Sequence, residues 1–225
     1  MQFFHELSGY LHYFVDVVLH LDLHLNAWIT QFGPWIYAFM FLVIFCETGL
    51  VITPFLPGDS LLFALGALTA VDNAFLKLPL LCFTLVSAAI LGDITNYSIG
   101  RFFGTKAFSN PNSKLFRREY LDRTNRFYER HGGRALVIAR FAPILRTFAP
   151  FVAGVAQMTY ARFLTFSVIG GFTWVLSITI AGAFFGNLPA VKRNFHVVVV
   201  AIIFISLIPV LLEMWKARKE KRIPA

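Results

Sequence analysis

One stretch, residues 140–154, limits the folds that this chain can adopt. It reads Arg-Phe-Ala-Pro-Ile-Leu-Arg-Thr-Phe-Ala-Pro-Phe-Val-Ala-Gly, so two arginines and two prolines lie in otherwise apolar sequence. Proline removes a backbone donor and clashes with the preceding helical turn, which predicts a broken helix or a hairpin here. Arginine at membrane depth is costly and normally pairs with an acid or binds an anion. The stretch therefore predicts an anion site at Arg140 and Arg146 inside a membrane protein.

The composition of the chain indicates that lipid is its solvent. Of its 225 residues 57% are hydrophobic and 26 are phenylalanine, and its mean hydropathy is +0.67. These values exclude an ordinary soluble domain and predict an all-α integral membrane protein. The net charge of +8 does not indicate nucleic acid, because 14 of the 20 basic residues lie in 101–134 and 216–222, beside apolar segments. We expect residues 105–134 and the basic tail 216–225 to lie in the cytoplasm.

Residues 1–30 are predicted to form an amphipathic helix at the membrane surface. His12, Asp16, His20 and His24 recur every four residues and give one polar stripe beside apolar side chains. Histidines at this spacing are also typical of a metal or pH-sensing site. The usual third and fourth metal ligands are not evident, so the interfacial helix is favoured and we predict no metal or other cofactor.

Residues 34–70 predict a first re-entrant hairpin. They are apolar except for Glu47 and the sequence Thr53-Pro-Phe-Leu-Pro-Gly-Asp-Ser60, whose prolines interrupt a continuous helix. The apolar piece that follows is short for a membrane span. Asp59 suits the N-cap of a helix at 61–68 and a functional acid equally well. Glu47 has no capping role, and the cost of a charge inside the membrane favours a functional one.

True membrane spans are predicted at 80–103, 163–188 and 195–214. In the first of them, small residues recur every four positions around Gly92 and Gly100, a spacing that lets helices approach closely. Asp93 is interpreted mainly as part of this packing face. The alternative is that Asp93 pairs with one of the arginines.

A weak internal repeat relates the two halves of the chain. Each half has a hairpin with two prolines and then a span, and the spans end in Ile-Gly-Arg-Phe-Phe-Gly104 and Ala-Gly-Ala-Phe-Phe-Gly186, 82 residues apart. With Arg101 in the cytoplasm, the first span runs inward and the second outward, as in secondary transporters whose sites lie between inverted repeats. We therefore expect an inverted repeat of two re-entrant helical hairpins, each followed by a transmembrane helix. This transport domain covers residues 31–215, with an N-terminal amphipathic helix before it and a C-terminal transmembrane helix as its last element.

Three motifs also resemble those of a known family. Cys46-Glu-Thr-Gly-Leu-Val-Ile-Thr-Pro-Phe-Leu-Pro-Gly-Asp-Ser60, Gly92-Asp-Ile-Thr-Asn-Tyr-Ser-Ile-Gly-Arg101 and the 140–154 stretch are similar to motifs of the DedA family of bacterial inner-membrane proteins. The resemblance covers roughly residues 25–215. It implies a multi-pass protein of the bacterial inner membrane with two re-entrant hairpins, as in the eukaryotic lipid scramblases of the same superfamily. Activity in that family is tied to the proton motive force, and its functional acids and arginines fall on Glu47, Asp59, Arg140 and Arg146.

The function that the resemblance implies is lipid movement. Several family members are regarded as flippases for undecaprenyl phosphate, the carrier lipid of the cell wall, or as phospholipid translocators. We therefore expect a proton-linked flippase whose partners are membrane lipids and protons. Arg140 and Arg146 would bind the phosphate with bidentate hydrogen bonds. Glu47 and Asp59 would neutralise the arginines in the empty site and carry protons. Auxiliary roles are expected for three further residues: Gly58, Asp93 and Thr147.

Other functions were weighed against this one. A proton-coupled exporter of small ions or drugs and a phospholipid scramblase remain as alternatives. An enzyme acting on lipid phosphate is disfavoured, because none of the six histidines lies in the hairpins or core spans and no Gly-x-Ser-x-Gly or His-Glu-x-x-His motif is present. A purely structural scaffold would leave the intramembrane glutamate and arginines without a purpose, although charge pairs can also serve assembly.

Overall fold

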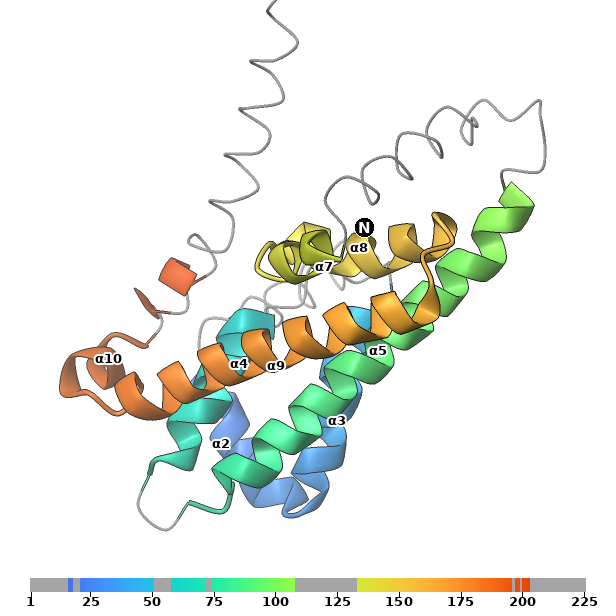
Figure 1. Cartoon of the computed structure of the whole chain (residues 1–225). Coiled ribbons are helices and arrows are strands. Elements are labelled where there is room, and N and C mark those ends of the chain that lie inside the picture. Colours follow the sequence, from blue (N-terminus) through green and yellow to red (C-terminus); the bar gives the residue numbers. More distant parts are fainter. Residues whose placement is uncertain are drawn as a thin grey trace, which may run out of the picture.

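The described part of the chain is helical throughout. The computed structural model describes residues 16–17, 21–50, 58–71, 74–107, 133–195, 197–198 and 200–202. Figure 1 shows two long helices, α5 and α9, with shorter helices packed around them. The elements in chain order are α2 (Leu21–Phe32), α3 (Trp35–Gly49), α4 (Gly58–Thr69), α5 (Leu78–Ala107), α7 (Arg134–Ala139), α8 (Pro143–Val155), α9 (Tyr160–Phe185) and α10 (Pro189–Arg193).

Within these residues, three segments are long and apolar enough to cross a membrane: Ala27–Gly49, Leu78–Phe103 and Tyr160–Phe185. The second and third confirm the spans predicted at 80–103 and 163–188. Large apolar side chains such as Phe83 and Phe184 are exposed on their surfaces, which fits contact with lipid. The predicted span at 195–214 and the basic segment at 105–134 lie mostly outside the described residues.

The first predicted hairpin corresponds to helices α3 and α4. Helix α3 ends at Gly49, where Leu50 is extended, and α4 begins at Gly58; the two prolines lie between these helices, outside the described residues. Before α3, Gly33 turns the chain out of α2 with a φ of 52°, a conformation that costs glycine little because it has no Cβ. Of the helix predicted within residues 1–30, the structure describes residues 16–17 and then α2, which begins at Leu21 and ends at Phe32. Whether the arms of the hairpin re-enter the membrane stays a prediction.

The second hairpin is broken at one proline and continuous through the other. Helix α7 ends at Ala139 and α8 begins at Pro143, at a position where the missing N–H is not needed. Pro150, in contrast, lies inside α8, so only one of the two prolines marks the break. The carbonyl of Arg146 therefore lacks the bond that residue 150 would normally donate. Arg140, at the end of α7, and Arg146, in the first turns of α8, lie on opposite sides of the break.

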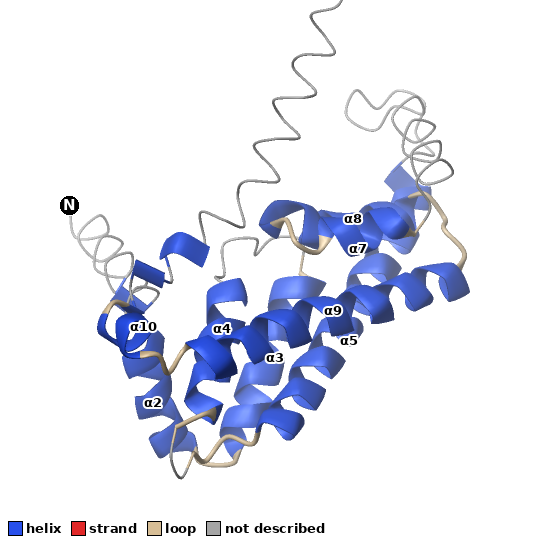
Figure 2. Ribbon diagram, turned by 60° about the vertical axis from the view of Figure 1, so that its left-hand side comes forward, coloured by secondary structure: helices blue, strands red, loops and turns tan. Residues whose placement is uncertain are grey.

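The packing of the helices repeats between the two halves. Helix α4 of the first half packs against α9 of the second, and α8 of the second packs against α5 of the first (Figure 2). Each contact contains two glycines, Gly66 and Gly182 between α4 and α9, and Gly154 and Gly100 between α8 and α5. A Cβ at any of the four would lie 2.0–2.1 Å from a backbone oxygen of the partner helix. Gly100 and Gly182 are the glycines of the two matching span ends, so the repeat seen in the sequence is also a repeat in packing.

Helices α5 and α9 run in opposite directions. Asn187, just after α9, donates to the carbonyl of Ala67 at 3.0 Å, near the end of α4 that leads toward the start of α5. Tyr160, at the start of α9, lies 6.0 Å from Tyr97 between ring centroids, in the later half of α5. This arrangement agrees with two halves of opposite orientation.

Two apolar clusters leave a gap between them along the helices. The larger one is built from residues of α2, α3, α4 and the first part of α5, together with α9 from Trp174 onward. The smaller one joins α7 and α8 to Tyr97 of α5 and Phe163 of α9. On α9 the residues between the two clusters include Ser167, and on α5 they include Asp93. Polar side chains occupy this interval, which is where the candidate site lies.

Candidate functional site

All five ionisable residues singled out from the sequence are buried. Glu47, Asp59, Asp93, Arg140 and Arg146 are each at most 7% exposed. They come from α3, α4, α5, the end of α7 and α8, and the chain brings them together between the two apolar clusters. Burial of so many charges is sustained only if they pair with each other or bind a charged ligand.

Arg146 joins the second hairpin to the first. Its Nη1 donates to Asp59 Oδ1 at 2.5 Å, and its Nη2 forms an ion pair with Glu47 Oε1. Glu47 lies in the last turn of α3 and Asp59 in the first turn of α4. The two acids therefore lie at the end of α3 and the start of α4, and the side chain of Arg146 connects them. Asp59 directs its carboxylate to this arginine while occupying the helix start that favours an acid.

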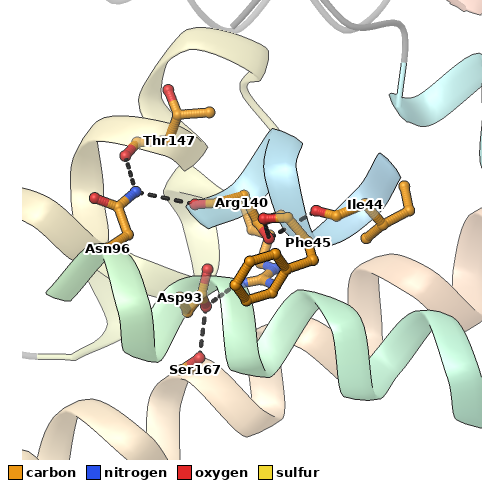
Figure 3. A network of polar contacts seen from close by, with 8 residues as sticks. Ile44, Phe45, Asp93, Asn96, Arg140, Thr147 and Ser167 are labelled. Carbon is orange, nitrogen blue, oxygen red and sulfur yellow. Dashed lines mark hydrogen bonds and ion pairs between the residues drawn. The ribbon is translucent and has the colours of Figure 1, made fainter. Parts of the chain in front are cut away.

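Arg140 has a different counter-ion from the one that we expected. Its Nη1 pairs with Asp93 of α5, and the same Asp93 oxygen accepts a hydrogen bond from Ser167 Oγ at 2.5 Å (Figure 3). The expectation that Glu47 and Asp59 neutralise both arginines is therefore wrong for Arg140. The alternative interpretation of Asp93 is the correct one, and it holds together with close helix packing, since a Cβ on the neighbouring Gly92 would lie 1.9 Å from Thr48 Oγ1.

Asn96 fixes both hairpins to α5. Its Nδ2 donates to the carbonyl of Thr48 at 3.0 Å and to the carbonyl of Thr147 at 2.6 Å (Figure 3). The carbonyl of Thr48, in the last turn of α3, has no helical N–H partner, and a side-chain amide can supply one. Thr147, which the sequence suggested as an auxiliary residue, is fully buried and contributes its backbone to this network.

Gly58 is required by the position of Glu47. A Cβ at residue 58 would lie 2.2 Å from Glu47 Oε2, and the backbone of Gly58 forms a hydrogen bond to this carboxylate. The glutamate cannot easily move aside, because Arg146 holds its other oxygen. The backbone at Gly58 therefore lies close to the carboxylate, and the auxiliary role expected for this glycine stays a prediction.

Trp174 is part of the site, although no sequence motif pointed to it. Its indole Nε1 donates to Asp59 Oδ1 at 2.8 Å, and its ring lies 5.6 Å from Cζ of Arg140 and 4.9 Å from Cζ of Arg146. Ser167, also missed, lies seven residues earlier, on the same face of α9. The sequence signal for these two site residues was their spacing, two polar side chains two helical turns apart within an apolar span.

The cluster holds more acid than base and retains free donors. Three carboxylates face two guanidiniums, so the fully ionised cluster carries a net charge of −1. Within the described residues, Nε and Nη2 of Arg140 and Nε of Arg146 have no hydrogen-bond partner. Arginine N–H groups that are buried and unpaired are suited to an additional anion.

Metal ligands are not grouped in the described part of the chain. There, no set of three or more His, Cys, Asp and Glu side chains could hold a metal ion. Of the polar stripe near the N-terminus, His24 Nε2 lies 3.0 Å from Asp16 Oδ2, and His12 and His20 are outside the described residues.

Comparisons with known proteins identify the family. The VTT domain matches residues 56–184 of the chain. Protein DedA of Escherichia coli is 50% identical over 209 residues, covering 93% of this chain and 95% of its own. An uncharacterized membrane protein of Mycobacterium tuberculosis is 38% identical over 85% of this chain and 84% of its own. The inner membrane protein YqjA of Escherichia coli is 37% identical, over 68% of this chain and 69% of its own. No solved structure matches. The chain therefore belongs to the DedA family of membrane proteins, which carry the VTT domain.

Proposed function

We propose that this protein is a flippase that moves an anionic lipid phosphate, either undecaprenyl phosphate or a related lipid, across the inner membrane in a proton-linked cycle. The observation that carries the proposal is the pair of buried arginines on either side of the α7–α8 break, which keep unpaired N–H donors although each is ion-paired. Each guanidinium has five N–H donors, and those that Asp93, Glu47 and Asp59 do not use are available to a phosphate.

The chemistry of arginine fits a phosphate headgroup. Guanidinium presents two parallel N–H groups to two phosphate oxygens, and this bidentate bond is strong where water is excluded. The lipid tails would stay in the bilayer, against the exposed apolar faces of the helices. The α7–α8 break lies next to these arginines, so a headgroup could reach them without a continuous helix in its way.

The site has more carboxylates than guanidiniums, which gives a reason for phosphate binding to be coupled to protons. With three carboxylates and two guanidiniums, the site is neutral only when it holds one proton, and an incoming phosphate adds at least one negative charge. A buried net charge is unfavourable, so a bound phosphate calls for further protons. Glu47 and Asp59 are the groups most suited to carry them, because the two share one arginine. Asp93 would act mainly as the counter-ion of Arg140.

The orientation that we propose follows the charge of the sequence. The basic segment 105–134 and the C-terminal tail lie in the cytoplasm, near anionic headgroups. The antiparallel α5 and α9 then open the site to opposite sides in alternation, which is the usual working of inverted repeats.

The test is lipid translocation in proteoliposomes that contain labelled undecaprenyl phosphate, with and without a proton gradient. We expect the intact protein to move the lipid faster with the gradient, and the Arg146→Ala variant to move it no faster than protein-free liposomes. Arg162→Ala, at an exposed position at the start of α9, is the matched control and should behave as the intact protein does.

The same assay separates the rival functions. Movement of the lipid at one rate with or without a gradient would favour a scramblase. No movement of undecaprenyl phosphate, while labelled phospholipids move and Arg146→Ala stops them, would keep the phosphate site and change the substrate. If neither lipid moves, the flippase proposal is wrong and small ions become the substrates to examine.

A further inference from the structure

Helix α9 surrounds the side chain of Arg140 with small residues. Ser167 bonds the Asp93 oxygen that pairs with Arg140, and Gly170 and Gly171 lie beside the arginine stem and head. A Cβ added at Gly170 would lie 3.3 Å from Arg140 Cδ, and one added at Gly171 would lie 3.6 Å from Nη2. The contact at Gly170 is tighter than usual, so the missing side chain there leaves room for the stem of Arg140, whereas the distance at Gly171 is an ordinary van der Waals contact.

Trp174, further along α9, contacts both Arg140 and Arg146. Its ring is within 6 Å of both guanidinium carbons, at 5.6 Å for Arg140 and 4.9 Å for Arg146, which is the range of cation–π attraction. Its N–H bonds the Asp59 oxygen that also accepts from Arg146. Trp174 is completely buried, so these attractions act without competition from water.

Two positive groups on one aromatic ring would repel each other if nothing held them. Asp93 holds Arg140 from one side, Asp59 holds Arg146 from the other, and Trp174 contacts both arginines and one of the acids. Among the described residues of α9, no other side chain contacts both guanidiniums in this way. Trp174 of α9 therefore contributes to the distance between the two guanidiniums, although α9 is not part of the hairpin motifs.

We infer that Trp174 is a positioning residue that fixes the spacing of Arg140 and Arg146, so that both guanidiniums address a single phosphate monoester. This inference rests on the proposed function for the identity of the ligand. The indole of Trp174 would thus determine how the phosphate headgroup fits, through its π face and its N–H group. A packing residue of similar size would fill the same space and would not supply either contact.

The first test compares binding by variants that fill similar volume. Dodecyl phosphate is titrated into the detergent-solubilised full chain, with inorganic phosphate in a parallel arm to separate lipid headgroup from free phosphate. We expect Trp174→Met to weaken dodecyl phosphate binding by about 10- to 100-fold, because it lacks both contacts. Trp174→Phe, which keeps an aromatic face, should bind several-fold better than Trp174→Met. Trp35→Met, at a position 76% exposed, is the control and should bind as the intact chain does.

Equal binding by the Phe and Met variants would reduce Trp174 to a packing residue and overturn the inference. Binding by Trp174→Met that matches the intact chain would do the same. Inorganic phosphate that binds as tightly as dodecyl phosphate would make free phosphate the ligand, with the role of Trp174 unchanged.

The second test needs no ligand and remains valid if the Met variant fails to fold. Phenylalanine at positions 28, 35 and 215 leaves Trp174 as the single tryptophan of the chain. Its fluorescence emission should shift in Arg146→Gln and in Asp59→Asn, and stay constant in Arg162→Gln. Unchanged emission in the first two variants would overturn the positioning role. If emission shifts but no phosphate binds to any form, the proposed function fails and the role of Trp174 stands.

Discussion

At the scale of single residues, the two arginines of the site are not equivalent. Arg146 shares its charge between Glu47 and Asp59, whereas Arg140 has Asp93 as its one acidic partner among the described residues. Glu47 and Asp93 are each 1% exposed, so they differ in partners and not in burial. This asymmetry predicts different consequences for the same chemical change from acid to amide.

Asp93→Asn should destabilise the protein more than Glu47→Gln does. The first leaves Arg140 buried without a negative partner, which costs about 3–5 kcal/mol, while the second leaves Arg146 paired with Asp59 and costs about 1–3 kcal/mol. The measurement is unfolding in mixed micelles with increasing SDS, followed by far-UV circular dichroism. Equal destabilisation by the two variants would contradict the assignment of counter-ions.

Arg140→Lys tests whether the two-nitrogen geometry of the guanidinium matters, because the substitution keeps the positive charge. Lysine can still pair with Asp93, but it has no second nitrogen in a fixed plane to offer a phosphate. We expect lipid translocation to fall by about 10-fold or more, the value of one or two charge-assisted hydrogen bonds. Arg162→Lys, exposed on α9, should have no effect in the same assay. Wild-type rates in Arg140→Lys would show that bidentate binding at this residue is not used.

Most charged residues of the site were predictable, and so were the partners of Arg146, whereas the partner of Arg140 and the role of Trp174 were not. Proline next to intramembrane charge is a local signal, so Glu47, Asp59, Arg140 and Arg146 could be found in the sequence. The partner of Arg140 depends on the packing of α9 against both α5 and α7, which the residues near Asp93 do not specify. Trp174 was missed for a related reason, because a tryptophan in an apolar span looks like any core residue until its neighbours are known.

At the scale of helices, paired glycines decide how the two halves interlock. Gly66 and Gly182 bring α4 onto α9, and Gly100 and Gly154 bring α8 onto α5, each with backbone where a side chain would otherwise lie. Backbone cannot give way as a flexible side chain can. The four-residue spacing of small residues predicted close helix contact on α5, but the partner helix came from the structure.

Alanine at either glycine of the matching span ends should destabilise the fold. In Gly100→Ala and Gly182→Ala the new Cβ would meet a carbonyl oxygen at 2.1 Å, so the helices must separate, at a cost of about 1–3 kcal/mol each. Thermal unfolding in detergent measures the loss. Thr173→Ala, on the exposed face of α9, is the control. Similar losses in the two glycine variants would fit equivalent contacts, and an unchanged melting temperature would contradict the close packing.

At the scale of the whole molecule, the site lies where two oppositely directed halves meet. The first half supplies Glu47, Asp59 and Asp93, and the second supplies both arginines with Ser167 and Trp174. A shift of one half against the other would therefore separate acids from arginines. Such separation of charge requires a compensating ligand, which is the physical link between phosphate binding and conformational change in the proposed cycle.

The opposite orientation of the two halves predicts a definite pattern of accessibility. Lys77 precedes α5 and Leu188 follows α9 at one end of the molecule, while Arg162 lies in the first turn of α9 at the other, and all three side chains are exposed. In a chain whose two cysteines at 46 and 82 are replaced by alanine, Lys77→Cys and Leu188→Cys should react with a membrane-impermeant maleimide added to spheroplasts. Arg162→Cys should react only after the membrane is opened, because in the proposed orientation its end of the molecule faces the cytoplasm with the basic segment. Labelling of Leu188→Cys and Arg162→Cys from the same side would contradict a membrane-crossing α9, and labelling of Lys77→Cys only from inside would reverse the proposed orientation.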